Sequence, residues 1–368
     1  MAGHADRVSG LRLLDPLPPE LLRSDAPTLL AALGGPTLAR VPGTRDSAGG
    51  SAGGSAGTAG ARPRGVVVLQ HGDERTGLDA LLTVLRDDPP LPYDLHVLFG
   101  NVEAALAPPG FAHRMLPHQA DMNRAWFADG EPGGGHDTVS VAARAALHRL
   151  RDLDLAAVVD LHNTTGDNPF HAIVATDDPA TRALAALFTP LIVRWDQQLH
   201  TLLEGLRDHC VAVTVECGRA GSDGAHAFAV AGLRRYLAAP DPARLHAPDD
   251  VRVLRRMRRV IVDPTATLAF GGVDADDGRL TADVVVAADV EARNGVGQDA
   301  GWLLATVRPG HERSLRVRDI DGVDVTDALL EVERGQVRVR TATTPLMMTG
   351  SVAAARADCL TYLLDRGV

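Results

Sequence analysis

Three valine-rich runs, each followed by a histidine or a carboxylate, constrain the possible folds of this chain more than any other feature. They are 66–74 (VVVLQHGDE), 158–165 (VVDLHNTT) and 213–218 (VTVECG). Short β-branched runs predict buried strands, and open parallel sheets bind their ligands beyond the carboxyl ends of the strands. We therefore expect the polar residues that follow the runs to meet in one crevice. These residues are His71, Glu74, His162 and Glu216.

Two histidines and a glutamate are a common ligand set of a catalytic zinc site, which keeps its fourth position open for water. His71 and Glu74 are three residues apart directly after a strand, so both side chains can reach one ion, and His162 supplies the third ligand. Glu216 is then the candidate general base for hydrolysis. Asp160 lies two residues before His162, on the same face of the strand. There it can accept the hydrogen bond that fixes the imidazole tautomer.

Between residues 65 and 240, short apolar runs alternate with helix-like segments. Such alternation predicts an α/β fold, in which helices flank both faces of a mostly parallel sheet. Beyond residue 245, strand-like runs follow one another between Gly- and Asp-rich turns, which predicts a smaller β-rich domain. We therefore expect an N-terminal extension (1–64), a catalytic domain (65–245) and a β-rich C-terminal domain (246–368) with a closing helix over Ala353–Leu364.

The segment 47–60 is almost wholly Gly, Ala and Ser. Such a composition buries too little apolar surface to offset the entropy of ordering it, so we expect a flexible loop. The segment leads into the strand at 65–70, which places it at the end of the sheet opposite His71.

Composition argues against several classes of protein. Apolar residues make up 45% of the 368, which is enough for a sizeable core. The 37 basic and 47 acidic residues give a net charge of −10, so we expect no nucleic-acid or anionic-membrane partner.

The three cysteines form neither a zinc-knuckle nor a disulfide pattern, and no signal-like start or long apolar run is seen. We expect a cytoplasmic protein that acts on a small molecule. The protein could also form a homo-oligomer.

Four motifs follow one another between residues 65 and 220. They are His71-Gly72-Asp73-Glu74, Asp121-Met122-Asn123-Arg124, Asp160-Leu161-His162-Asn163-Thr164-Thr165 and Val215-Glu216-Cys217-Gly218. This succession resembles the succinylglutamate desuccinylase/aspartoacylase family of the zinc carboxypeptidase clan, and the third motif is its most specific piece. The resemblance implies a zinc carboxypeptidase-like α/β domain, followed by a second domain that the β-rich C-terminal region matches loosely.

The resemblance also implies the roles of the metal-binding and catalytic residues. His71, Glu74 and His162 bind one zinc ion per chain. Glu216 takes a proton from water and later passes it to the leaving amine. Arg114 polarises the scissile carbonyl or stabilises the oxyanion, although its spacing from the second motif is longer than the family's usual pattern.

Substrate recognition is implied in the same way. Asn123 and Arg124 grip a substrate carboxylate, for which a planar guanidinium is suited, and Asn163 is a further substrate-binding candidate. Aspartoacylases carry a substrate-binding tyrosine in their C-terminal segment, whereas this chain has an alanine near that position, at Ala353. Specificity for aspartate is therefore not carried over.

The activity expected on these grounds is zinc-dependent amide hydrolysis, or deacylation, of an N-acyl amino acid or a related small carboxylate. Two alternatives stay open. One is a zinc carboxypeptidase or esterase, because nothing in the chain decides the leaving group. The other is an inactive zinc-containing protein that binds an acylated metabolite.

Overall fold

A computed structural model describes residues 4–44, 61–127, 136–196, 198–271, 280–357 and 359–365. The segment 47–60, for which we predict a flexible loop, lies outside these residues. The chain divides into two compact units. The first comprises Met1–Asn163, His171–Ile192 and Gln198–Val251. The second comprises Thr164–Phe170, Val193–Gln197 and Arg252–Val368.

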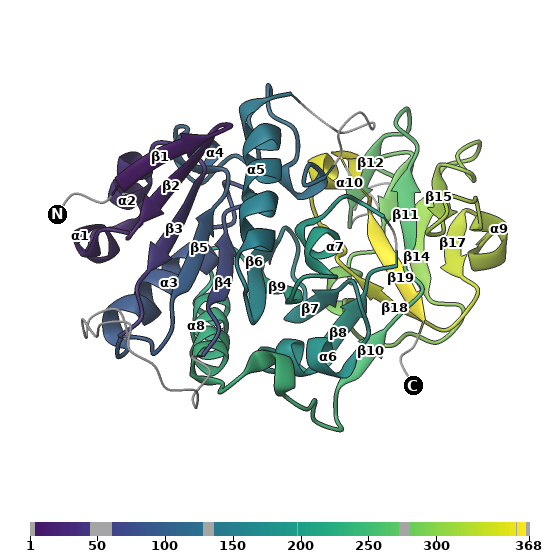
Figure 1. The fold of residues 1–368 in the computed structure, drawn as a ribbon. Helices are drawn as coiled ribbons and strands as arrows, with labels where there is room; N and C mark the ends of the chain where they lie inside the picture. Colours follow the sequence, from purple (N-terminus) through teal and green to yellow (C-terminus); the bar gives the residue numbers. More distant parts are fainter. Residues whose placement is uncertain are drawn as a thin grey trace. The chain divides into compact units, whose positions relative to one another are not determined.

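The first unit is built on a large sheet in which the strands run in the order β1-β2-β3-β5-β4-β6-β9-β7-β8 (Figure 1). The strands are β1 (His4–Val8), β2 (Leu11–Asp15), β3 (Thr37–Val41), β4 (Arg64–Val68), β5 (Leu95–Phe99), β6 (Ala157–Thr164), β7 (His171–Val174), β8 (Leu191–Arg194) and β9 (Val211–Arg219). At its centre, β4 pairs in parallel with both β5 and β6. Every residue of β4 is buried, as expected of a parallel strand that is covered on both faces.

Helices cover both faces of this central region. They are α1 (Pro19–Arg23), α2 (Ala26–Leu33), α3 (Thr76–Asp87), α4 (Val102–Leu106), α5 (Thr138–Asp152), α6 (Pro179–Ala186), α7 (Leu202–Leu206) and α8 (Asp223–Ala238), with short 3₁₀ turns η1 (Met122–Arg124) and η2 (Pro242–Arg244). The apolar faces of α5 and α7 share one core cluster with Val67 of β4. On the opposite face α3 lies so close to the sheet that a Cβ on Gly77 would be 3.3 Å from Val68 and 2.6 Å from Leu161. The mostly parallel α/β fold predicted from the sequence is thus confirmed.

Several of these helices begin at residues that cap them. Asp25, Asp137, Asp178, Thr201 and Ser222 each accept a hydrogen bond from a backbone N–H of the first helical turn. Short polar side chains stabilise helix starts in this way because the first N–H groups have no partner within the helix. The local sequence therefore determines where these helices start.

The second unit is rich in β-structure. Its sheets have the orders β15-β11-β19-β18 and β12-β13-β14-β17-β16. The strands are β10 (Arg252–Leu254), β11 (Arg258–Val262), β12 (Leu268–Phe270), β13 (Val284–Val286), β14 (Leu303–Val307), β15 (Leu315–Arg318), β16 (Leu330–Glu333), β17 (Gln336–Val339), β18 (Thr343–Leu346) and β19 (Thr361–Asp365), and the helices are η3 (Glu291–Arg293), α9 (Thr326–Leu329) and α10 (Val352–Ala357). Both sheets contribute to one apolar core, which includes Val260 and Leu363 from the first and Leu304 and Val337 from the second.

The end of the chain differs from the expectation. We predict a helix over Ala353–Leu364, but α10 ends at Ala357 and the chain then forms β19. This strand pairs with β11 on one side and β18 on the other, and Thr361–Leu364 are buried. A short apolar run of this kind cannot be assigned to helix or strand by periodicity alone, and here two flanking strands decide it.

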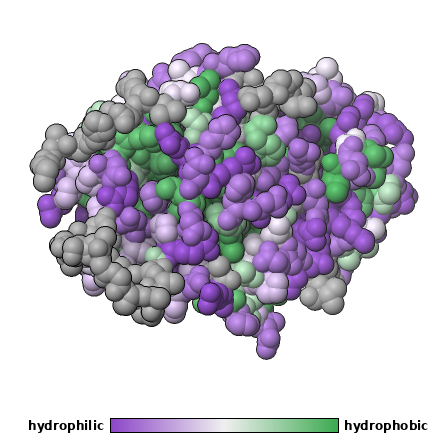
Figure 2. Space-filling model, in the orientation of Figure 1, coloured by the Kyte–Doolittle hydropathy of each residue, from purple (hydrophilic) through white to green (hydrophobic). Residues whose placement is uncertain are grey.

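The described surface is mainly polar in the view of Figure 2, with smaller hydrophobic areas between the hydrophilic ones. Among the described residues, the large hydrophobic side chains that are exposed are Met115, Val296, Val323, Val332 and Val352. None of the described helices is long and apolar enough to cross a bilayer.

Candidate metal centre

The three strands that carry the motifs position their polar residues in two ways. β4 ends at Val68, and Leu69 turns the chain with a positive φ of 59° before Gln70 and His71. Left-handed backbone is rare for a large side chain, and such strain gathers at functional sites. β6 and β9 extend further than the apolar runs predict, so His162 and Glu216 lie within the strands rather than after them.

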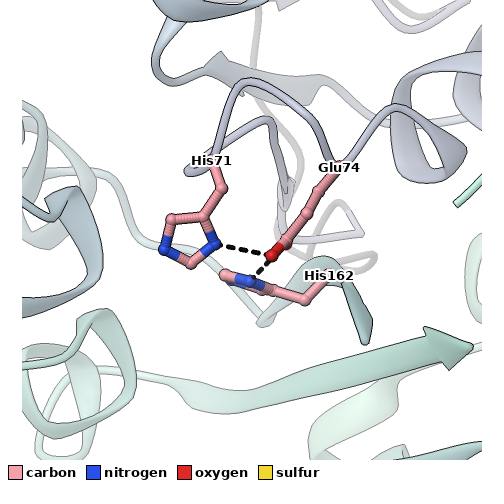
Figure 3. Close-up of side chains that lie close together, drawn as sticks. All are labelled: His71, Glu74 and His162. Atoms are coloured by element: carbon pink, nitrogen blue, oxygen red, sulfur yellow. Dashed lines mark hydrogen bonds and ion pairs between the residues drawn. The ribbon is translucent and has the colours of Figure 1, made fainter. Parts of the chain in front are cut away.

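His71, Glu74 and His162 meet in a buried cluster (Figure 3). The Nδ1 atom of His71 lies 2.8 Å from Oε1 of Glu74, and the Nδ1 atom of His162 lies 2.8 Å from Oε2. One ligand atom from each residue lies within 4.8 Å of the other two. The structure therefore brings together the three residues that the sequence analysis predicts as ligands.

The far side of each imidazole is held by a second carboxylate. His71 Nε2 lies 2.9 Å from Oδ1 of Asp121, and His162 Nε2 lies 2.9 Å from Oδ2 of Asp160. A neutral imidazole that donates from Nε2 keeps the lone pair of Nδ1 free for a cation. Metal-binding histidines in proteins almost always donate their other ring N–H to a carboxylate, a backbone carbonyl or water, so this donor set fits a divalent metal ion.

The charges of the cluster outweigh the effect of burial on its pKa values. Burial acts to raise the pKa of Glu74, but His71 and His162 hold it well below its usual value. Burial acts to lower the pKa of His162, but Asp160 and Glu74 raise it well above its usual value. The pKa of His71 is likewise raised, against burial, chiefly by Glu74. Without a metal ion the cluster thus favours protons on the imidazoles, and a metal ion would displace them.

Glu216 has a different environment from Glu74. Its Oε2 atom is enclosed and has no hydrogen-bond partner among the residues that the structure describes. Burial raises the pKa of Glu216 to about 7, although the charge of His162 acts against the shift. A carboxyl group with this pKa can exchange a proton at neutral pH, as a general base must.

Arg114 reaches the cluster from a neighbouring loop. Its Nη1 atom donates to Oε1 of Glu74 and its Nη2 atom to Oδ2 of Asp121, both at 3.2 Å. The backbone carbonyl of Arg114 also accepts from the N–H of Gly72 at 2.9 Å. The side chain stays partly exposed, so the guanidinium lies between solvent and the candidate ligand Glu74.

Of the residues predicted to bind substrate, two lie in a turn beside the cluster and one is buried next to it. Asn123 and Arg124 form the turn η1, where the N–H of Asn123 donates to Asp121, the partner of His71. The Asn163 side chain is buried and bonds to Thr76 and to the carbonyl of Gly218, while its backbone N–H donates to Glu74 at 3.1 Å. These contacts of Asn163 are structural, and its substrate-binding role stays a prediction.

Sequence reasoning did not single out the residues around Asp160. Oδ2 of Asp160 accepts from Nε2 of Gln70 at 2.6 Å and from Oγ1 of Thr214 at 3.0 Å, besides its contact with His162. Thr214 lies two residues before Glu216 on the same face of β9, so strand alternation could have indicated it. The bond from Gln70 depends on the turn at Leu69, for which the sequence carries no signal.

Comparison with known proteins identifies structures that share this fold. No protein-family model matches the sequence, and no curated protein matches it. Solved structures that are similar to this chain over most of their length include these three. A succinylglutamate desuccinylase/aspartoacylase of Shewanella frigidimarina has a TM-score of 0.53 at 14% identity, covering 90% of this chain and 92% of its own. One from Rhodobacter sphaeroides has a TM-score of 0.51 at 16% identity, covering 83% and 86%.

The product-bound ectoine utilization protein EutE (DoeB) of Ruegeria pomeroyi has a TM-score of 0.50 at 19% identity, covering 84% of this chain and 87% of its own. At such identities the likeness concerns the fold. The resemblance drawn from the four motifs is therefore confirmed at that level: this chain has the fold of the succinylglutamate desuccinylase/aspartoacylase structures.

Proposed function

We propose that the protein is a zinc-dependent amidohydrolase that removes the acyl group from an N-acyl amino acid or a related small carboxylate. The observation that carries the proposal is the buried cluster in which the Nδ1 atoms of His71 and His162 face Glu74, with Glu216 near enough for the charges of both histidines to act on its pKa. The fold shared with proteins named desuccinylase/aspartoacylase supports the reaction class.

The donor set favours zinc over harder cations. Two imidazoles and one carboxylate suit zinc, whereas magnesium and calcium prefer oxygen ligands. When bound, zinc supplies a Lewis acid and lowers the pKa of a water molecule toward neutrality. His71, Glu74 and His162 would hold the ion, and Asp121 and Asp160 would keep both imidazoles in the required orientation.

Glu216 is the residue best suited to move the proton. Its pKa of about 7 leaves much of it as carboxylate at neutral pH, and its Oε2 atom is not engaged by any described side chain. It would take the proton of the attacking water and return it to the amine as the amide bond breaks. Arg114 would stabilise the oxyanion, because its guanidinium already contacts carboxylate oxygens at the cluster.

The arginine beside the cluster supports the proposed substrate class. Arg124 lies near enough to the cluster for its charge to act on Asp121, and Asn123 precedes it in the turn η1. Guanidinium groups bind planar carboxylates in a bidentate manner. An acylated amino acid carries at least one such carboxylate, which supports this class of substrate.

The test is release of amine from a panel of N-acetyl, N-formyl and N-succinyl amino acids and short peptides, detected by mass spectrometry. Glu216→Gln should retain zinc and lose about 10²- to 10⁴-fold in kcat, the usual contribution of a general base. His71→Ala should lose both zinc and activity. Release only from peptide C-termini would indicate a carboxypeptidase, and a Glu216→Gln variant as active as the parent would refute the role of this residue.

A further inference from the structure

The carboxylate that holds His162 accepts hydrogen bonds from Gln70 and Thr214, and Gln70 is bonded in turn to Trp126. Asp160 is fully buried, and its Oδ2 atom accepts from Gln70 at 2.6 Å. The Oε1 atom of Gln70 in turn accepts from the indole N–H of Trp126 at 2.9 Å, and Trp126 is also fully buried. We propose that Trp126 and Gln70 are positioning residues, which act through Asp160 to set the orientation and tautomer of His162 for metal binding. This inference rests on the proposed metal-dependent function.

The donor and acceptor groups of these residues fix the direction of each hydrogen bond from Trp126 to His162. An indole N–H only donates, so the amide of Gln70 must turn its oxygen toward Trp126 and its NH₂ group toward Asp160. An ionised carboxylate only accepts, so Nε2 of His162 must carry the proton that faces Asp160. With that proton held on Nε2, a binding metal ion displaces the proton on Nδ1 of His162, and the lone pair of Nδ1 then faces the space beside Glu74, where the ion would bind.

One short segment thereby controls both histidines. Asp121, which precedes the turn η1, contacts Nε2 of His71 directly. Trp126, which follows the same turn, reaches His162 through Gln70 and Asp160. The backbone N–H of Trp126 is fixed by the carbonyl of His200 at 3.2 Å, so the segment has an anchor of its own.

The experiment measures the zinc dissociation constant of the apo protein by competition with a chromophoric chelator. Gln70→Met keeps a side chain of similar length without the amide, and should weaken zinc binding by about tenfold, the lower end for outer-shell partners. Trp126→Phe removes only the indole N–H and part of the ring. It should weaken binding by about threefold to tenfold, equivalent to one net hydrogen bond.

Two results distinguish a positioning role from general destabilisation. The double variant should bind zinc no more weakly than Gln70→Met, because both changes break the same chain of bonds. The visible absorption of the cobalt-substituted protein should change in both single variants, since it reports the geometry of the ligands. Additive losses in the double variant, or an unaltered cobalt spectrum, would overturn the inference.

Tyr236→Phe is the matched control. Tyr236 is a buried aromatic residue of the same unit, and its hydroxyl donates to the carbonyl of Ala157 at 2.8 Å. This variant should lose stability and bind zinc as the parent does. Unchanged zinc binding in Gln70→Met would refute the inference even if Trp126→Phe fails to fold. A parent that binds no zinc would instead refute the proposed function on which the inference rests.

Discussion

The charge of Glu74 acts on Glu216, yet their environments shift the pKa values of the two carboxyl groups in opposite directions. Burial acts to raise both values, but two adjacent imidazoles hold that of Glu74 well below normal. No side chain bonds to Oε2 of Glu216 among the described residues, and its pKa rises to about 7. Pairs of carboxyl groups divided in this way take different roles in catalysis. Glu74 is thereby suited to bind a cation, and Glu216 to exchange a proton.

The pH dependence of the reaction should follow Glu216. A base with a raised pKa is active above that pKa and is lost as pH falls through it, so kcat/KM should rise with pH up to neutrality. The apparent pKa of this limb should be about 7 or lower, because a bound cation favours the carboxylate. The measurement is kcat/KM from about pH 5 to 9. The residual activity of Glu216→Gln should lack the limb, and a flat profile in the parent would contradict the assignment.

At the scale of elements, the site depends on close contact between the turn after β4 and the helix α4. A Cβ atom on Gly72 would lie 2.5 Å from the backbone nitrogen of Ala105 and 2.6 Å from the carbonyl carbon of Ala104. Because these are backbone atoms within a helix, they cannot rotate away as a side chain could. Gly72 lies between His71 and Glu74, so any displacement of the turn moves two candidate ligands together.

Gly72→Ala should therefore lower both stability and metal affinity. We expect a loss of about 1–3 kcal/mol in the free energy of unfolding, typical of overpacking, and at least an approximately tenfold loss of zinc affinity, as for outer-shell changes. Urea unfolding and chelator competition measure the two effects. Gly35→Ala is the control, because its Cβ would meet nothing within 4 Å, and it should change stability by less than about 0.5 kcal/mol. Equal behaviour of the two variants would show that the turn tolerates the added atom.

The local sequence predicts the strands that carry the site residues, but it does not predict the contacts between those strands. The runs around Val67, Val159 and Val215 are apolar and β-branched, so their strands could be recognised along the chain. The order of those strands in the sheet could not be recognised, since pairing between distant segments leaves no local periodicity. The bonds around Asp160 and the closing strand β19 depend on such pairing, and the N-terminal strands β1 and β2 were missed for the same reason.

At the scale of the whole molecule, the three candidate ligands lie in the first of the two units. His71 and Glu74 come from the turn between β4 and α3, and His162 comes from β6, so a bound ion links segments that are distant in the sequence. The second unit has an apolar core of its own, shared by its two sheets. Binding at the cluster should therefore stabilise the first unit directly.

Metal removal tests this expectation. A ligand that binds only the folded state stabilises it by about 4 kcal/mol when its free concentration is 1,000 times the dissociation constant. Calorimetry of the zinc-loaded protein should therefore give a higher unfolding temperature than the same protein after chelation, and restoring zinc should reverse the loss. His71→Ala should unfold at the same temperature with and without zinc, because one of its three ligands is missing. If chelation left the parent's unfolding temperature unchanged, zinc would not be held by the folded cluster, since any ion bound only to the native state must raise that temperature.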